Sequence, residues 1–361
     1  MNSSFDDIRP YTDEELPAAL QRIAAWDLFP QVIRFIYPTV DVTAKKEEIL
    51  QIKSVHELQA TLMNDAIKRI IATTTQGFTY SGLNHLRRGV PYLFVSNHRD
   101  ITLDAFLLQH LLLEQRGCTS HIVFGQNLLA LPVMEDLFRC NKLIGMPRGG
   151  SPRQFYESLH HLSDYLHHLV VEQHQSVWIA QRNGRAKDGR DLTAPAVIKM
   201  LCLGGDGSPL QRLAELNLVP MSISYEWDPC DAMKANELFL SRSGSYQKAP
   251  GEDIKSVVTG IIGNKGRVHL SIGAPLTLRD LTPPAGADLS EHVASLLDQR
   301  IHNLFKPMPT HYAASHLLGQ RSFPGRYTQH TLNGLQARLN ALPDDDRRQL
   351  LLQMYANALA N

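Results

Sequence analysis

The chain has 361 residues, of which 43% are hydrophobic and 20% charged, so it is long and apolar enough for one large or two smaller globular domains. Its 36 lysines and arginines balance 36 aspartates and glutamates, which gives no overall positive charge to favour a nucleic-acid partner. The four cysteines lack CxxC or metal-type spacing, which is typical of free thiols in a reducing compartment. The polar, acidic N-terminus does not have the pattern of a signal peptide, and no run of about 18 apolar residues predicts a membrane span.

The first part of the chain is predicted to be helical. Residues 12–75 contain amphipathic stretches without an obvious catalytic cluster, so we assign residues 1–76 to an N-terminal helical region. Residues 26–37 are rich in aromatic and aliphatic side chains, and residues 122–137 are broadly apolar. Both segments fit either contact with a membrane surface or ordinary core packing.

Short β-rich runs alternate with helical patterns between residues 77 and 280, which predicts an α/β domain. The predicted strands are residues 78–80, 92–95, 121–124, 142–144, 177–179, 218–223 and 268–272. The clearest helix begins after Ser151, a good N-cap that precedes Pro152, and its apolar residues recur at helical spacing. After the prolines at 283–284, helical patterns predict a C-terminal helical region over residues 281–361.

His98 lies in the turn between the predicted strand 92–95 and a helical pattern, with Asp100 and Asp104 close behind it. A neutral imidazole can remove a proton from a hydroxyl, and a carboxylate on its other nitrogen fixes the tautomer and stabilises the imidazolium. Both aspartates are candidates for that carboxylate, although Asp100 also suits the N-cap of the helix. The alternative interpretation is a loop histidine beside a helix cap.

Two basic turns are candidate anion sites. Arg148 lies in a Gly/Pro-rich turn between a predicted strand and the helix after Ser151, where it is placed to grip a phosphate. The loop that leaves strand 177–179 holds the densest basic cluster of the chain, and its glycines allow close backbone approach. This cluster suits a phosphorylated or CoA-like anion, while a solvated charge run is the alternative. It consists of Arg182, Arg185, Lys187 and Arg190.

Two other patterns are weaker. His98-Arg99-Asp100 imitates the kinase catalytic loop, but Ala105 stands where that loop needs asparagine, so we exclude a kinase. His161, Asp164 and His168 share one helical face with a spacing that metal ligands can have, but a polar helix face is the simpler interpretation.

Four blocks of the chain, in order and spacing, resemble the glycerolipid acyltransferase family, which includes lysophosphatidate and glycerol-3-phosphate acyltransferases. Asn97-His98 with a nearby aspartate matches the family's Asn-His-x4-Asp motif, and residues 143–148 match a strand that ends in arginine. Residues 179–185 match Phe-Pro-Glu-Gly-Thr-Arg loosely, and Val219-Pro220 matches a Val-Pro strand. The resemblance covers residues 77–230 and implies a mixed sheet flanked by helices, with the helical regions at both ends as extensions.

This chain departs from the family pattern at two places. The aspartate of the first motif comes one residue late, since Leu103 stands at the usual position and Asp104 follows it. The Pro-Glu pair of the third motif is absent, and Asn183 precedes Gly184 there. The turn after His98 must therefore absorb one extra residue, and the way in which the acceptor is held is left open.

The resemblance implies that His98 is the base and Asp104 its orienting partner, with Asp100 as the fallback. It also implies that Arg148, Gly184 and Arg185 bind the acceptor phosphate, and we add Lys187 on its charge alone. The implied reaction moves a fatty acyl group from acyl-CoA or acyl-carrier protein to a hydroxyl of a glycerolipid such as lysophosphatidate or glycerol 3-phosphate.

The implied reaction uses no metal or redox cofactor, and its lipid substrates place it in the cytoplasm or peripherally at the inner membrane. The partners expected are a lipid acceptor, an acyl-thioester donor and the membrane surface, with no nucleic acid. Two alternatives stay open at this point. One is a non-catalytic protein that binds lipid or acyl-carrier protein on the same scaffold, and the other is an acyltransferase for a non-phosphate acceptor.

Overall fold

The computed structural model describes residues 5–125, 132–146, 149–244 and 246–359. Seven strands form one sheet in the order β1-β7-β6-β2-β5-β3-β4. The strands are β1 (Thr75–Ser81), β2 (Leu93–Ser96), β3 (His121–Gly125), β4 (Leu143–Met146), β5 (Val177–Ala180), β6 (Leu218–Tyr225) and β7 (Gly266–Ile272). Each coincides with a strand predicted from sequence. Neighbouring strands run parallel except β6 and β7, which are antiparallel, so the mixed sheet is confirmed.

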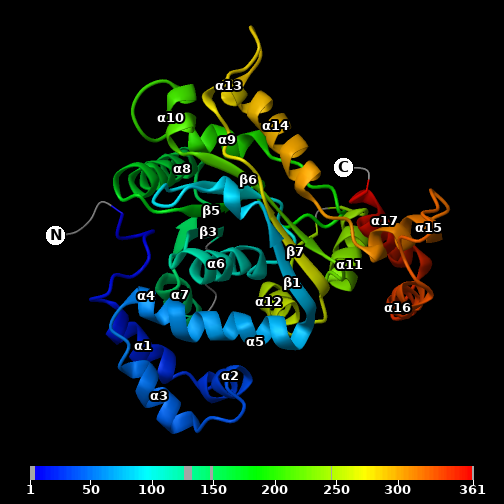
Figure 1. Ribbon diagram of the computed structural model, residues 1–361, viewed down its shortest axis with the longest axis horizontal. Helices are drawn as coiled ribbons and strands as arrows, with labels where there is room; N and C mark the ends of the chain where they lie inside the picture. The colour runs from blue at the N-terminus through cyan, green and yellow to red at the C-terminus, as the bar shows by residue number, and fades with distance from the viewer. Residues whose placement is uncertain (1–4, 126–131, 147–148, 245, 360–361) are drawn as a thin grey trace.

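Helices cover both faces of the sheet, and further helices precede its first strand and follow its last strand along the chain (Figure 1). The N-terminal helices are α1 (Leu16–Ala24), α2 (Phe29–Ile36), α3 (Val42–Leu50), α4 (Val55–Leu58), the π-helical turn η1 (Gln59–Met63) and α5 (Asn64–Thr74). The helices among the strands are η2 (Leu83–His85), α6 (Leu103–Arg116), α7 (Pro132–Cys140), α8 (Pro152–His167), η4 (His168–Glu172), α9 (Pro195–Leu201), α10 (Pro209–Glu215), α11 (Asp231–Ser241), α12 (Glu252–Ile262) and α13 (Leu278–Leu281). The C-terminal helices are α14 (Leu289–Leu304), α15 (Pro309–Leu317), α16 (Gln329–Asn340) and α17 (Asp345–Asn357).

The core has two layers because side chains alternate between the faces of each strand. On β2, Leu93 and Val95 pack toward α8, α9 and α14, whereas Phe94 packs toward α5 and α6. Trp178 of β5 joins the layer of Phe94. The central strands β2, β5 and β6 are buried on both faces, which explains why their sequences read as continuous apolar runs, whereas the edge strand β1 is largely exposed.

The N-terminus of α8 has the cap that the sequence predicts. The Ser151 hydroxyl accepts a hydrogen bond from the backbone N–H of Gln154, and the Gln154 side chain accepts one from the backbone N–H of Ser151. This reciprocal capping box satisfies donors that a helix otherwise leaves unpaired. It fixes where α8 starts, close to the cavity described below.

The terminal helices form two further apolar clusters. In the N-terminal cluster, Phe29, Ile33 and Ile36 of α2 are buried, so core packing explains these residues of segment 26–37, while Leu28 and Val32 are exposed. The segment 122–137 includes residues 126–131, which lie outside the described residues.

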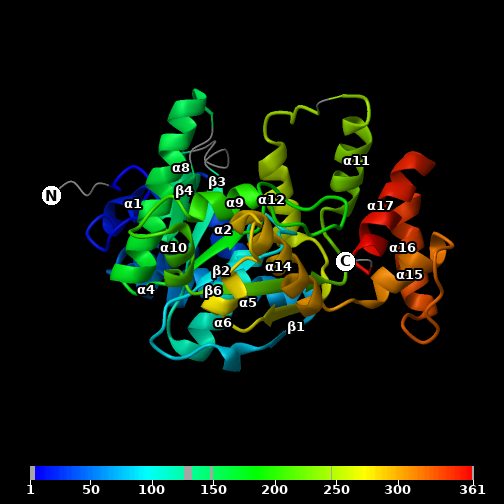
Figure 2. The ribbon, with the colours of Figure 1, turned by 90° about the horizontal axis from the view of Figure 1, so that it is seen from above.

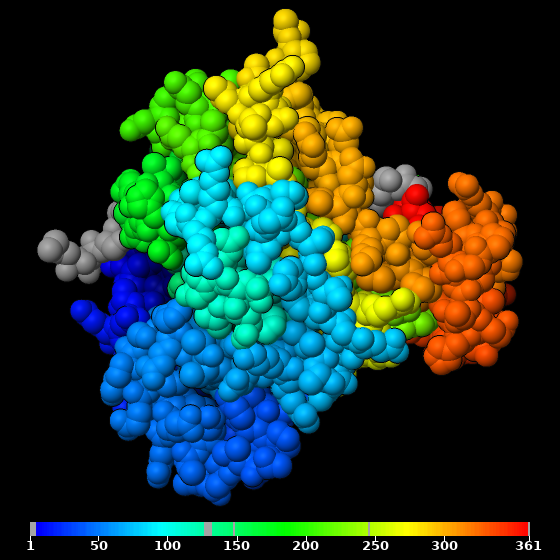
Figure 3. Space-filling model, in the orientation of Figure 1, coloured from blue at the N-terminus to red at the C-terminus, as the bar shows by residue number. Residues whose placement is uncertain are grey.

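At the other end, α14 packs on the sheet and α15–α17 form a separate cluster with α11. Figures 2 and 3 show the N-terminal and C-terminal helices at separate corners of the molecule. None of the helices in the described part of the chain is long and apolar enough to cross a bilayer.

Candidate active site

The turn that carries His98 is fixed by Asn97, the residue that follows β2. The Asn97 side chain accepts a hydrogen bond from the backbone N–H of Ile223 at 2.8 Å and donates one to its carbonyl at 3.0 Å. Asn97 is fully buried, so its amide replaces a backbone pairing with β6 where β2 has ended. This contact sets the position from which the next side chain, His98, projects.

His98 lies at the carboxyl end of the sheet, and its Nδ1 is 3.0 Å from Oδ2 of Asp104. Its ring contacts the edge of Trp178 with a centroid distance of 5.7 Å. The Trp178 indole is itself held by a hydrogen bond from Nε1 to the Ser96 hydroxyl at 2.9 Å. Because Nδ1 is directed at a carboxylate, Nε2 is the ring nitrogen left to exchange a proton with a substrate.

The two candidate aspartates have different partners. Asp104 is 1% exposed, and besides His98 its Oδ2 accepts hydrogen bonds from the backbone N–H groups of Arg99 at 2.6 Å and Asp100 at 3.0 Å. Asp100 Oδ1 instead accepts from the backbone N–H groups of Thr102 and Leu103, where α6 begins. The structure therefore places the Asp104 carboxylate beside the His98 ring and Asp100 at the start of α6. The turn after His98 accommodates the one residue by which this chain exceeds the family motif.

Burial, followed by the neighbouring Asp104 carboxylate, raises the pKa of Asp100. Two backbone N–H groups and a tyrosine hydroxyl donate hydrogen bonds to Asp104. A charged Asp104 is the form that can stabilise an imidazolium on His98.

Tyr225, at the end of β6, is a site residue that the sequence did not reveal. Its hydroxyl donates a hydrogen bond to Asp104 Oδ1 at 2.9 Å. Burial is the main cause that raises the pKa of Tyr225 well above its usual value, so the phenol stays a donor. No local pattern marks this residue, because its role depends on β6 lying beside β2.

We expect Tyr225→Phe to lower kcat by about 10- to 100-fold, since support of this kind behind a functional group has effects of that size. The KM values for the acyl donor and the acceptor should change little. The Tyr225 hydroxyl lies behind the Asp104 carboxylate and does not line the cavity that contains His98. Steady-state kinetics of the two proteins would check this. An unchanged kcat would show that Tyr225 serves packing alone.

A basic loop, which we define as residues 182–190, lies beside the His98 turn. The backbone N–H of Ala186 donates to the His98 carbonyl at 2.8 Å and ties the loop to the turn. Gly184 has φ +75°, a left-handed conformation that glycine adopts readily. Gly184, Arg182 and Arg185 all line the same cavity as His98.

Arg185 is 9% exposed, and its Nη1 is buried without a hydrogen-bond partner among the described residues. Burial alone would lower the pKa of Arg185, but the nearby Cys230, Asp100 and Asp228 side chains raise it, so the guanidinium stays charged. A buried donor without a partner costs free energy unless a ligand or water satisfies it. Arg185 is therefore placed to bind an anionic oxygen.

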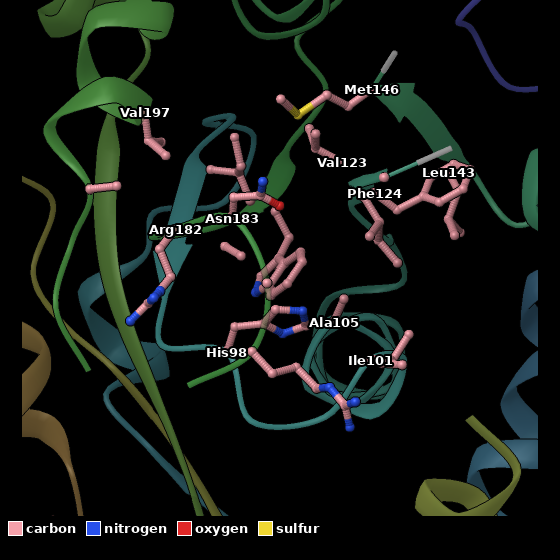
Figure 4. Close-up of a pocket in the computed structure, with 18 of the residues that line it drawn as sticks. His98, Ile101, Ala105, Val123, Phe124, Leu143, Met146, Arg182, Asn183 and Val197 are labelled. Atoms are coloured by element: carbon pink, nitrogen blue, oxygen red, sulfur yellow. The ribbon is translucent and has the colours of Figure 1, made fainter. Parts of the chain in front are cut away.

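The cavity beside His98 has a volume of about 340 Å³. Polar side chains, including His98 and Arg185, line one part of it, and apolar side chains line the rest. In Figure 4, His98 and Arg182 lie to the left of Phe124 and Leu143. Phe155 and Leu159 of α8 also line the cavity, whereas Leu162 and Leu166 farther along the same predicted face are buried in the core. Other apolar lining residues are Phe106, Val123, Phe138, Met146, Val197 and Met200.

Residues 77–195 match the family model described as "Acyltransferase", which includes the His98 turn and the basic loop. Over these residues the chain is similar to the acyltransferase family. The predicted resemblance to an acyltransferase is confirmed for residues 77–195.

One similar solved structure is that of the 1-acyl-sn-glycerophosphate (LPA) acyltransferase PlsC from Thermotoga maritima. The two chains are 12% identical, with a TM-score of 0.40 over 81% of this chain and 95% of that chain. No curated protein matches this chain.

The structure places the other predicted site residues of this chain in different settings. Lys187 lines the cavity but forms an ion pair with Glu237, so its charge is already compensated. Arg148 lies outside the described residues. The Val219-Pro220 strand lies within the core and does not line the cavity. On the helical face of His161, Asp164 and His168, the His168 imidazole lies 2.8 Å from the Glu172 carboxylate.

Proposed function

We propose that this acyltransferase moves a fatty acyl group from an acyl thioester, either acyl-CoA or acyl-carrier protein, to a hydroxyl of a phosphorylated glycerolipid acceptor. One observation carries the proposal: the His98–Asp104 pair lies at the polar end of an apolar cavity, beside a buried arginine with a nitrogen that has no hydrogen-bond partner within the described part of the chain. The base, the acyl chain and the anionic group each have a place in this arrangement.

In the proposed mechanism, His98 Nε2 takes the proton from the acceptor hydroxyl as its oxygen attacks the thioester carbonyl. Asp104 stabilises the imidazolium that forms, through the contact to Nδ1. The tetrahedral intermediate then collapses, the carbon–sulfur bond breaks, and the imidazolium returns its proton to the leaving sulfur. The new ester bond replaces the thioester, so the reaction requires no metal or redox cofactor.

The apolar wall suits the fatty acyl chain. Each methylene group removed from water contributes about 0.8 kcal/mol, so the rings of Phe106, Phe124 and Phe138 favour a hydrocarbon over a polar ligand. Arg185 suits the acceptor phosphate, because a guanidinium binds phosphate oxygens through charge-assisted hydrogen bonds. Since the substrates are lipids, we expect the protein to work in the cytoplasm or at the surface of the inner membrane.

The His98–Asp104 contact favours catalysis over a scaffold that only binds lipid or acyl-carrier protein. A binding protein would have no need for a carboxylate held by Tyr225 and two backbone N–H groups behind the histidine. The buried Arg185 likewise favours a phosphorylated acceptor over one without phosphate.

The test is an acyl-transfer assay with labelled acyl-CoA and acyl-carrier protein as donors. The acceptor panel contains lysophosphatidate, glycerol 3-phosphate and a monoacylglycerol, which lacks the phosphate. We expect turnover with at least one phosphorylated acceptor and little with monoacylglycerol. Turnover with monoacylglycerol alone would overturn the phosphate assignment, and fatty-acid binding without any turnover would support the binding-only scaffold.

A further inference from the structure

The last helix of the chain, α17, contacts the basic loop from the side away from the cavity. The Asn357 side chain donates a hydrogen bond through Nδ2 to the carbonyl of Asp188 at 2.7 Å. Next to it, Gly189 lies directly against the backbone carbonyl of Met354. These residues are separated by more than 160 positions in sequence, so the contact joins the C-terminal helices to the acyltransferase domain.

The contact at Gly189 leaves no room for a side chain. Gly189 has φ +77°, and a Cβ atom at this position would lie 1.9 Å from the carbonyl oxygen of Met354. The neighbouring atom belongs to the backbone of a packed helix, which cannot move aside as a flexible side chain can. The path of the basic loop and the position of α17 therefore depend on each other.

The same loop is held on its other side by Arg99 of the His98 turn. Arg99 Nη2 donates to the Gly189 carbonyl at 3.3 Å and to Asp191 Oδ2 at 2.5 Å. Asp191 Oδ2 also accepts from the Asn97 side chain at 3.1 Å. The end of the basic loop is thus fixed between the turn that carries the base and the C-terminal helix.

A second connection runs from α17 to the His98 turn through α11. The Tyr355 hydroxyl accepts a hydrogen bond from the backbone N–H of Asp228 at 2.9 Å and donates one to Asp231. Asp228 pairs with Lys234, whose Nζ donates to the Arg99 carbonyl at 2.7 Å. Asp228 is also one of the charges that act on Arg185.

We propose that α17 is a positioning element of the active site, which holds the basic loop in the conformation that presents Arg185 to the acceptor. This inference rests on the proposed function and extends it to a region outside the matched acyltransferase domain. Asn357 and the Met354 carbonyl act through the loop and touch no substrate. Disturbing them should therefore weaken acceptor binding more than donor binding.

The test variant is Gly189→Ala, and the matched control is Gly325→Ala. Gly325 has φ +78°, nearly the same backbone conformation, but a Cβ atom there would meet no atom within 4 Å. Both variants carry the strain of alanine in the left-handed region, and only Gly189→Ala collides with α17. We expect the acceptor KM of Gly189→Ala to rise by about 10-fold, because the variant weakens the Arg185 contact without removing it, with the donor KM nearly unchanged. Gly325→Ala should behave as wild type.

A milder variant and a second readout distinguish a loss of positioning from misfolding. Asn357→Asp keeps the side-chain shape and removes the donor to Asp188, and we expect a smaller rise in acceptor KM. Hydrogen exchange of the amides in residues 182–190 should be faster in Gly189→Ala and Asn357→Asp than in Gly325→Ala and wild type. This readout needs no turnover, so it tests the positioning even if the acyl-transfer assay contradicts the proposed function. Equal exchange and equal acceptor KM in Gly189→Ala and Gly325→Ala would overturn the inference.

Discussion

Asp104→Asn is expected to lower kcat by about 10⁴-fold, while Asp100→Asn leaves most of the activity in place. An asparagine at position 104 keeps the shape but cannot stabilise the imidazolium or hold the His98 tautomer, and changes of this type in a Ser-His-Asp triad cost about that factor. Asp100 accepts hydrogen bonds from the backbone where α6 begins, so its replacement should cost about 1 kcal/mol of stability.

The measurement pairs steady-state kinetics with urea unfolding for both variants. The two aspartates are a matched pair, because they lie four residues apart in one turn and both are buried. A larger loss of kcat in Asp100→Asn than in Asp104→Asn would contradict the assignment of the orienting carboxylate. Equal losses, accompanied by equal losses of stability, would show that both residues serve the fold.

Arg185→Met is expected to raise the KM for a phosphorylated acceptor by about 10- to 100-fold, the effect of losing a hydrogen bond to a charged group. Methionine retains much of the side-chain volume in a site that is 9% exposed, so the variant removes the charge with little change in packing. Arg185→Lys keeps the charge and loses the planar fork, and should fall between methionine and wild type.

The acyl donor is the internal control for Arg185, since its KM should change little in either variant. Thermal unfolding of both variants would show whether the buried Asp100 and Asp228 tolerate the loss of the nearby cation. If Arg185→Met remains folded and binds the phosphorylated acceptor as wild type does, the assignment of Arg185 to the phosphate is wrong.

Much of the fold follows from local sequence. The strands could be predicted because short apolar runs such as β2 and β5 are bounded by polar turns, and the start of α8 could be predicted because a capping box needs only neighbouring residues. The pair of His98 and Asp104 is also local, since Asp104 lies in the first turn of the helix that follows the His98 turn.

The rest of the site depends on contacts between distant segments. Tyr225 reaches Asp104 only because β6 pairs with β2, and Lys187 meets Glu237 only because α11 packs beside the basic loop. A local charge pattern could not reveal that Lys187 is compensated while one nitrogen of Arg185 has no partner among the residues that the structure describes. The contact of α17 with Gly189 was equally beyond prediction, because nothing near either residue in sequence indicates the other.

The central claim is that His98 is the base of an acyl transfer. The most direct test compares wild type with His98→Ala, using the productive donor and acceptor from the assay panel. We expect kcat to fall by about 10²- to 10⁴-fold, the contribution of a general base, while fatty-acid binding persists because the apolar wall is intact. Turnover by His98→Ala equal to that of wild type would contradict the claim and place the chemistry elsewhere in the molecule.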